Sequence, residues 1–174
     1  HIKLSLANTG GIKLGAKFCL DQTRPGIGLY GINNTGHKLR IMSKELVLPF
    51  ELYAPIIQIR CVNKNEPISY DGIDITKRKS KLATIGIGYA DGWLRLLKPN
   101  SSFLLYKNKC NLLGNVTMDS FILDITNIKE KTFKEGDYFC LLNNSNISNV
   151  IKNSGIISYE LLTLFGSRLV REYN

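Results

Sequence analysis

LATIGIGYADGW, residues 82–93, joins a strand-like apolar run to a tyrosine and an Ala-Asp-Gly turn. A short apolar run rich in branched residues and bounded by turn signals is typical of a buried strand. Tyr89 then stands at the end of a rigid strand, with its hydroxyl directed out of it. A core tyrosine, whose ring is buried and whose hydroxyl meets a backbone carbonyl, is the alternative for this segment taken alone.

Short strands with turn signals surround this stretch from about residue 45 onward. Ile57, Ile59 and Cys61 alternate with polar residues, and Asp71-Gly72 is a hairpin signal. Three further strands and two short helices are expected at 109–118, 120–125, 135–142, 147–155 and 158–166. We therefore predict a mainly β domain over residues 46–174.

Two strand-like segments precede that domain. KLSLANTGGI (3–12) predicts a short strand that ends in a polar turn, and RPGIGLYGI (24–32) predicts a second buried strand opened by a Pro-Gly turn. Two such segments at this spacing suit an α/β unit, which we place at residues 1–45. The chain begins with His1 rather than methionine, so we expect a fragment and make no prediction about targeting.

Composition and charge exclude several classes of protein. The 174 residues, 44% hydrophobic and 21% charged, predict one globular domain or one plus part of another. The net charge of +9 could favour phosphate-bearing ligands, nucleic acid or anionic membranes without choosing among them. Apolar stretches end well before the roughly 18 residues of a membrane span. Four widely spaced cysteines and two histidines predict no metal site, and reduced thiols in a cytoplasmic protein.

Three further segments could carry chemistry, each with a plainer alternative. In RPGIGLYG (24–31) glycine N–H groups can approach an anion and Arg24 can donate to a ring nitrogen, although an ordinary turn also fits. GNVTMD (114–119) ends by presenting Met118 and Asp119, or is a hairpin edge with a capping aspartate. In ISYEL (157–161) Tyr159 stands at a helix start that suits an anion, or belongs to the core.

LANTGGI (6–12) is followed along the chain by these four segments. This sequence of motifs resembles the C-terminal half of bacterial alanine racemase, over nearly the whole chain. Members of that family are dimeric and use pyridoxal phosphate. Their cofactor site lies in an α/β (TIM-type) barrel, and a mostly β domain follows it. The resemblance thus implies that residues 1–45 are the end of a barrel and 46–174 the β-rich domain. It also implies a homodimer that interconverts L- and D-alanine.

The resemblance implies a catalytic role for Tyr89, as the acid and base on one face of the substrate α-carbon. A phenol with a reference pKa near 10 needs nearby positive charge or hydrogen bonds for that task. Met118 matches the residue whose backbone N–H holds the substrate carboxylate, and Asp119 would orient the loop or act directly. The lysine opposite the tyrosine has no matching motif in this chain, which we therefore predict to be inactive alone.

The resemblance assigns the cofactor to five other residues. Arg24 matches the arginine that faces the pyridine nitrogen, and it would leave that nitrogen largely neutral because guanidinium keeps its proton. The phosphate would be held by the set Thr9, Gly26, Ile27 and Tyr159. Thr9 replaces the usual serine, and Ser5 stands where many members have a histidine.

The basic run 77–81, KRKSK, keeps a different class of function open. A small basic β domain could bind RNA or another polyanion, or act as a dimerisation module, whereas a solvated loop is the plainer interpretation. No aromatic RNA-binding strand accompanies the run. The prediction from the sequence is therefore a racemase fragment with no nucleic-acid or membrane partner.

Overall fold

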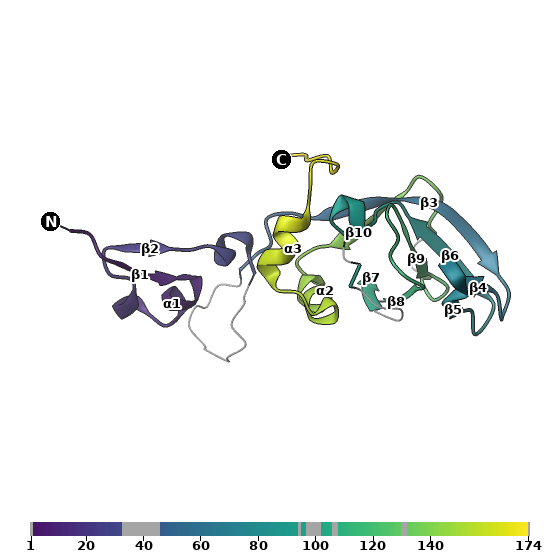
Figure 1. Ribbon diagram of the computed structural model, residues 1–174, viewed down its shortest axis with the longest axis horizontal. Helices are drawn as coiled ribbons and strands as arrows, with labels where there is room; N and C mark the ends of the chain where they lie inside the picture. The colour runs from purple at the N-terminus through teal and green to yellow at the C-terminus, as the bar shows by residue number, and fades with distance from the viewer. Residues whose placement is uncertain are drawn as a thin grey trace. The chain divides into compact units, whose positions relative to one another are not determined.

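The computed structural model describes residues 2–32, 46–93, 95–96, 102–105, 108–129 and 132–173 (Figure 1). They form two compact units that divide between Phe50 and Glu51. The first unit contains β1 (Ser5–Asn8), α1 (Thr9–Lys13), η1 (Ala16–Phe18), β2 (Gln22–Arg24) and η2 (Ile27–Tyr30). The strands of the second are β3 (Leu52–Val62), β4 (Pro67–Ile68), β5 (Asp74–Ile75), β6 (Ser80–Ile85), β7 (Ser102–Leu105), β8 (Asn108–Leu113), β9 (Phe121–Asp124) and β10 (Tyr138–Leu142). Its helical segments are η3 (Tyr70–Gly72), η4 (Tyr89–Asp91), α2 (Ile147–Ser154) and α3 (Ser158–Leu164).

The first unit is built on a strand–helix–strand element. β1 and β2 are parallel, with Ser5 opposite Gln22, and α1 lies between them in the chain. Asn8 ends β1 and caps α1, because its side-chain oxygen accepts the Gly11 N–H at 3.0 Å. The described residues contain this one parallel pair and no further strands of a barrel.

The strand predicted at 24–32 is wrong. β2 ends at Arg24, and Ile27–Tyr30 form a single 3₁₀ turn instead. The reason is local, since Pro25 and Gly26 open a turn and two glycine N–H groups of this segment donate to a threonine hydroxyl rather than to a strand. Hydrophobic content alone therefore misassigned a glycine-rich turn.

The second unit is organised around one six-stranded antiparallel sheet. The strand order is β10-β3-β6-β9-β8-β7, and Figure 1 shows the sheet curling as it crosses the unit. A register shift in β3 between Ile56 and Gln58 bends the longest strand next to β6. The mainly β domain predicted from the sequence is confirmed.

The core of this unit draws on most strands of the six-stranded sheet. Residues at 1% exposure or less include Ile85, Leu112, Phe121, Leu123, Phe139 and Leu141. Each fully buried side chain of this size contributes about 1.5–3 kcal/mol to folding. The hairpin β4–β5 covers a further cluster of Val62, Ile68 and Leu82.

The turns, strands and helices follow the local signals, but three elements end earlier than predicted. The predicted hairpin at Asp71-Gly72 is confirmed, and both residues have positive φ angles of 59° and 58°. Helix α2 ends before Gly155 as expected. Strand β6 ends at Ile85 rather than at residue 88, and α3 ends at Leu164, before the predicted stop at Gly166. The strand predicted at 109–118 is too long, because β8 ends at Leu113 and Gly114, with φ of 69°, begins a turn.

Candidate functional site

The turn that carries Tyr89 lies just beyond the end of β6. Tyr89 is 41% exposed, so it is not a core tyrosine. Behind it Trp93 is 2% exposed and donates its backbone N–H to the Gly88 carbonyl at 3.0 Å. The Trp93 ring stacks on Phe121 with 5.8 Å between ring centroids. The Tyr89 turn therefore presents an exposed phenol and is supported by the stacked, buried rings of Trp93 and Phe121.

A positive charge lies over the ring of Tyr89. The guanidinium carbon of Arg95 is 5.6 Å from the ring centroid, which is within the range of a cation–π interaction. Arg95 is itself exposed. The sequence analysis did not identify this cationic neighbour of Tyr89.

Met118 belongs to a second turn, Thr117–Ser120, which precedes β9 and contacts the Tyr89 turn directly. The backbone N–H groups of Tyr89 and Ala90 donate to the carbonyls of Thr117 and Met118, both at 3.0 Å. The Thr117 hydroxyl donates to the Ser120 carbonyl at 2.8 Å and closes the turn on itself. The predicted Tyr89 and Met118 are thus brought together by main-chain hydrogen bonds.

Gly88 permits this close approach. A Cβ added at residue 88 would lie 2.2 Å from the Met118 carbonyl oxygen and 2.4 Å from that of Thr117. The backbone of Gly88 is extended, so the requirement for glycine is one of space rather than of backbone conformation. Only glycine fits between the two turns.

Arg168, which the sequence analysis missed, ion-pairs with both turns. Its Nε lies 3.0 Å from Asp91 Oδ1, and its Nη2 donates to Asp119 Oδ1 at 2.8 Å. The hydrogen bond to Asp119 and then the charge of Asp91 raise the pKa of Arg168. The sequence signal that could have found it is the pair of aspartates in two turn motifs, which require a counter-charge.

Tyr159 is placed on α3, one residue after that helix begins, as predicted. Its side chain is 46% exposed, so it is not a core residue either. The other end of α3 abuts the Tyr89 turn, because Gly92, with φ of 88°, would place a Cβ 2.0 Å from the Leu164 carbonyl oxygen. Helix α3 and the Tyr89 turn are therefore packed backbone against backbone.

In the first unit, Arg24 is held by the strand beside it. Its Nη1 donates to the Ser5 hydroxyl at 2.6 Å and to the Ser5 carbonyl at 3.0 Å, and Nη2 donates to the Leu6 carbonyl at 3.4 Å. Ser5 therefore holds the arginine with both its side chain and its backbone. Arg24 remains exposed at the end of β2.

The Thr9 hydroxyl accepts two hydrogen bonds from the glycine-rich turn 26–28. The backbone N–H groups of Gly26 and Gly28 donate to Thr9 Oγ1 at 3.0 and 3.1 Å. The methyl group that distinguishes threonine from serine fits because residue 28 has no side chain, since a Cβ there would lie 2.8 Å from Thr9 Cγ2. Gly28 is a further member of this group that the sequence analysis did not single out.

This set offers donors to a phosphate and to a pyridine nitrogen. The Thr9 hydroxyl accepts from the Gly26 and Gly28 amides and has a hydrogen of its own that can be donated to a phosphate, and Arg24 is a permanent donor in the same unit. The residues predicted to bind the phosphate belong to both units. Thr9, Gly26 and Ile27 lie in the first unit, and Tyr159 lies in the second.

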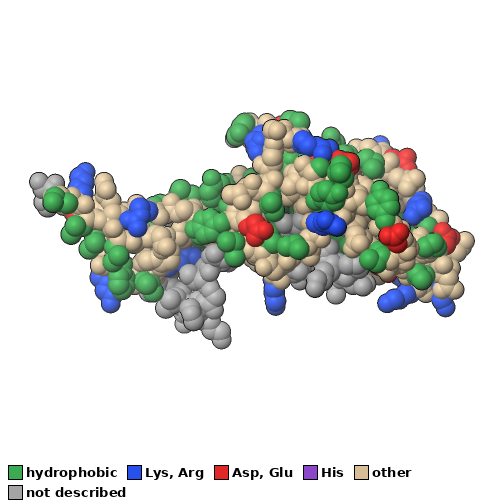
Figure 2. All heavy atoms as spheres, in the orientation of Figure 1, with side chains coloured by type: hydrophobic (Ala, Val, Ile, Leu, Met, Phe, Trp, Pro, Cys, Tyr) green, Lys and Arg blue, Asp and Glu red, His purple; other side chains and the backbone are tan. Residues whose placement is uncertain are grey.

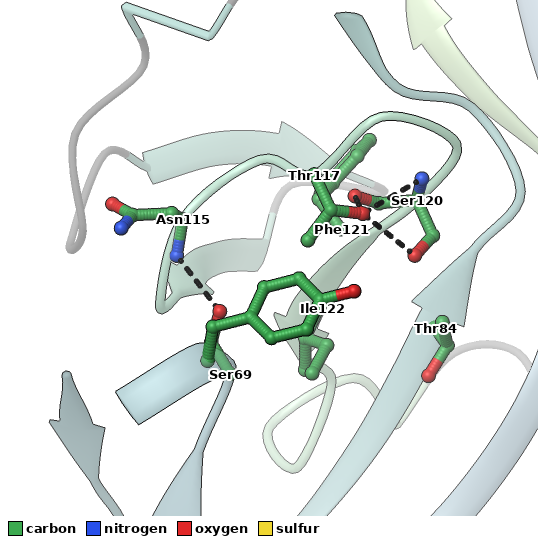
Figure 3. Close-up of a pocket in the computed structure, with 8 residues that line it drawn as sticks. Ser69, Thr84, Asn115, Thr117, Ser120, Phe121 and Ile122 are labelled. Atoms are coloured by element: carbon green, nitrogen blue, oxygen red, sulfur yellow. Dashed lines mark hydrogen bonds between the residues drawn. The ribbon is translucent and has the colours of Figure 1, made fainter. Parts of the chain in front are cut away.

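An open groove of about 320 Å³ is lined in part by Thr117 and Ser120, as Figure 3 shows. Its lining mixes serine, threonine and asparagine side chains with two aromatic rings and an isoleucine, and the Asn115 N–H donates to the Ser69 hydroxyl at 3.4 Å. None of the predicted site residues lines this groove. The candidate site is therefore defined by the exposed turns and not by this cavity.

Charge and cysteines add little to the site. On the face drawn in Figure 2, lysine and arginine side chains are scattered among acidic and apolar ones. All four cysteines are free thiols. Among the described residues no group of three His, Cys, Asp or Glu side chains could hold a metal ion.

No helix in the described part of the chain is both long enough and apolar enough to cross a membrane.

The curled six-stranded sheet is the kind of β domain found in solved alanine racemases. A family model described as the C-terminal domain of alanine racemase matches residues 49–173. The chain belongs to the alanine racemase family.

Known members of the family resemble almost the whole chain. The alanine racemase of Rhizobium meliloti is 37% identical over 99% of this chain and 48% of its own length, and that of Brucella abortus is 33% identical over 97% and 45%. Alanine racemase from Bartonella henselae, solved with covalently bound pyridoxal phosphate, superposes with a TM-score of 0.88 at 35% identity, covering 100% of this chain and 47% of that one. The chain thus spans slightly less than half the length of these relatives.

Proposed function

We propose that this chain is the C-terminal part of a pyridoxal-phosphate-dependent alanine racemase, a homodimer that interconverts L- and D-alanine. The observation that carries the proposal is the Tyr89 turn. It holds a 41% exposed phenol beside an arginine and fixes it by main-chain hydrogen bonds to the Met118 turn. Membership of the family supports the same function. The relatives also have an N-terminal part. A protein that contains both that part and this chain is called the complete racemase below.

The cofactor would be held mainly by residues of the first unit. The Thr9 hydroxyl and the Gly26 and Ile27 amides, with Tyr159 from the second unit, are the candidates for binding its phosphate. Arg24, anchored by the Ser5 hydroxyl, is the candidate donor to the pyridine nitrogen. When bound, pyridoxal phosphate withdraws electrons from the substrate and makes the α-hydrogen of alanine removable.

Tyr89 would remove and return the α-proton on one face of alanine, opposite a lysine of the N-terminal part. The Met118 N–H would hold the substrate carboxylate, since its turn is closed by the Thr117–Ser120 hydrogen bonds. Arg24 would keep its own proton and leave the pyridine nitrogen neutral, which favours rapid return of the α-proton over side reactions.

The test is isotope exchange in the complete racemase with Tyr89→Phe. We expect exchange of the α-hydrogen with solvent to fall by about 10²–10⁴ for one alanine enantiomer, because a positioned acid–base group is lost. Equal and small losses for both enantiomers would show that Tyr89 is not the catalytic group.

The polyanion-binding alternative is not favoured. Arg78, the second residue of the basic run, donates to Asp124 and Asn127 at 3.1 Å each, and the Asp124 carboxylate neutralises part of the charge of the run within the domain. The face shown in Figure 2 has no continuous basic stripe. The proposed partner is therefore a small amino acid rather than a nucleic acid or a membrane.

A further inference from the structure

Two turns of the second unit each carry a carboxylate beside a proposed functional residue. Asp91 ends the turn that begins with Tyr89, and Asp119 follows Met118 directly in the chain. The guanidinium of Arg168 contacts both, at 3.0 Å and 2.8 Å. One side chain from the C-terminal segment thus links the two turns.

The contact with Asp91 reaches into the base of the Tyr89 turn. Asp91 is 9% exposed, and its second oxygen, Oδ2, accepts the Gly88 N–H at 2.8 Å. Removing Arg168 would leave this nearly buried carboxylate without its counter-charge, a costly state that moves the backbone it holds. The charge of Arg168 therefore acts on the same turn that positions the phenol.

The segment that presents Arg168 is itself anchored. Helix α3 ends against Gly92, and Arg171 Nη2 donates to the carbonyls of Phe165 and Gly166 at 3.2 and 3.4 Å. The segment after α3 is thereby folded back on itself. Because these contacts anchor the segment after α3, the position of Arg168 next to the two aspartates is fixed.

The planar fork of an arginine suits this task, because it fixes the direction of two hydrogen bonds at once. A lysine has one charged nitrogen and cannot reproduce both directions. The main-chain bonds set the distance between the Tyr89 and Met118 turns, and the two ion pairs of Arg168 restrain their relative rotation.

We propose that Arg168 is a positioning residue that locks the Tyr89 turn against the Met118 turn, and so aligns the proposed base with the proposed carboxylate site. The inference rests on the proposed function of Tyr89. It adds a residue that acts through Asp91 and Asp119 and has no part in the chemistry of its own.

The experiment compares Arg168→Met, Arg168→Lys and Arg78→Met in the complete racemase. Arg78 is a matched control because it too is about half exposed (48% against 52%) and pairs with a mostly buried aspartate at 3.1 Å. It lies at the end of β6 opposite to the Tyr89 turn. A general loss of stability would appear equally in both methionine variants.

Two readouts separate positioning from stability. In Arg168→Met, we expect amide hydrogen exchange in residues 88–92 and 117–120 to become about tenfold faster. Exchange of the alanine α-hydrogen on the face served by Tyr89 should fall by about 10–10², with KM changed by less than about threefold. Arg168→Lys should recover part of each effect, and Arg78→Met should show neither.

The possible outcomes are decisive. Unchanged amide exchange in Arg168→Met, or equal effects in Arg78→Met, would overturn the inference even if Tyr89→Phe abolishes exchange as proposed. Should Tyr89→Phe have no effect, the proposed function fails, and amide exchange alone still decides whether Arg168 locks the turns. If Arg168→Met does not fold, Asp119→Asn removes one ion pair only, and faster exchange confined to the two turns would support the same conclusion.

Discussion

Gly88→Ala should separate the Tyr89 turn from the Met118 turn. Alanine adopts the extended backbone of residue 88 readily, so the effect arises from the added methyl group alone. That methyl would lie 2.2 Å from the Met118 carbonyl oxygen, whereas an ordinary contact needs more than about 3 Å. The turns must therefore move apart by about 1 Å.

This movement breaks both 3.0 Å hydrogen bonds that join the turns. Each contributes about 0.5–1.5 kcal/mol, and the forced overpacking adds about 1–3 kcal/mol, so the free energy of unfolding should fall by about 4 kcal/mol. Gly86→Ala is the control, because its methyl would meet side-chain atoms of Ile57 and Pro55 at 2.9 and 3.2 Å and would come no closer than 3.4 Å to the backbone oxygen of Pro55. We expect that variant to lose about 1 kcal/mol or less.

The assay is guanidinium unfolding of this chain, followed by the fluorescence of its single tryptophan. Trp93 is a local probe, since its backbone N–H donates to the Gly88 carbonyl. A Gly88→Ala midpoint that matches the wild type, or a loss no larger than that of Gly86→Ala, would refute the steric argument.

Four other changes test separate parts of the structure. Thr9→Val removes the hydroxyl that accepts from Gly26 and Gly28. In a fluorescence titration of the complete racemase, this variant should bind pyridoxal phosphate about tenfold or more weakly than the wild type, whereas Thr9→Ser should bind it about as well. Ser5→Ala removes the 2.6 Å acceptor of Arg24 but leaves the carbonyl acceptors, so the same titration should show only a few-fold loss, about two- to fivefold. Arg24→Glu should lower racemisation and raise pyruvate formation from alanine, because a carboxylate stabilises a protonated pyridine nitrogen that guanidinium does not. Burial, followed by the charge of Asp124, raises the pKa of Cys110 to about 12, so the stability that the neutral thiol contributes should be complete below about pH 9 and be lost as the pH rises toward 12, which unfolding midpoints across that range would measure.

Local signals predicted the parts of the fold that depend on neighbouring residues. The Asp71-Gly72 hairpin, the strands and the position of Tyr159 near a helix start follow from turn chemistry and periodicity. The segment 24–32 was predicted wrongly, because its glycine amides are engaged by Thr9, 17 residues earlier, and not by a strand partner. Short apolar runs between glycines carry too little information to distinguish these outcomes.

Residues of the candidate site could be predicted from the sequence only where they belong to a recognisable motif. Tyr89 and Met118 stand in recognisable turns, and the structure brings those turns into contact. Arg168 was missed because its partner Asp119 is 49 residues away in the chain and its own segment has no periodic pattern. Arg95 and Gly28 were missed for a related reason, since their contributions are set by packing in three dimensions.

The close backbone contacts around the Tyr89 turn limit how this part of the gene can vary. A Cβ at residue 88 or 92 would meet a carbonyl oxygen at 2.2 or 2.0 Å. Every single-nucleotide missense change of a glycine codon introduces at least a Cβ, so no one-step mutation at either position leaves the turn in place. Resistance to a ligand that binds against this turn would have to arise at other residues, where exposed side chains can change without moving the backbone.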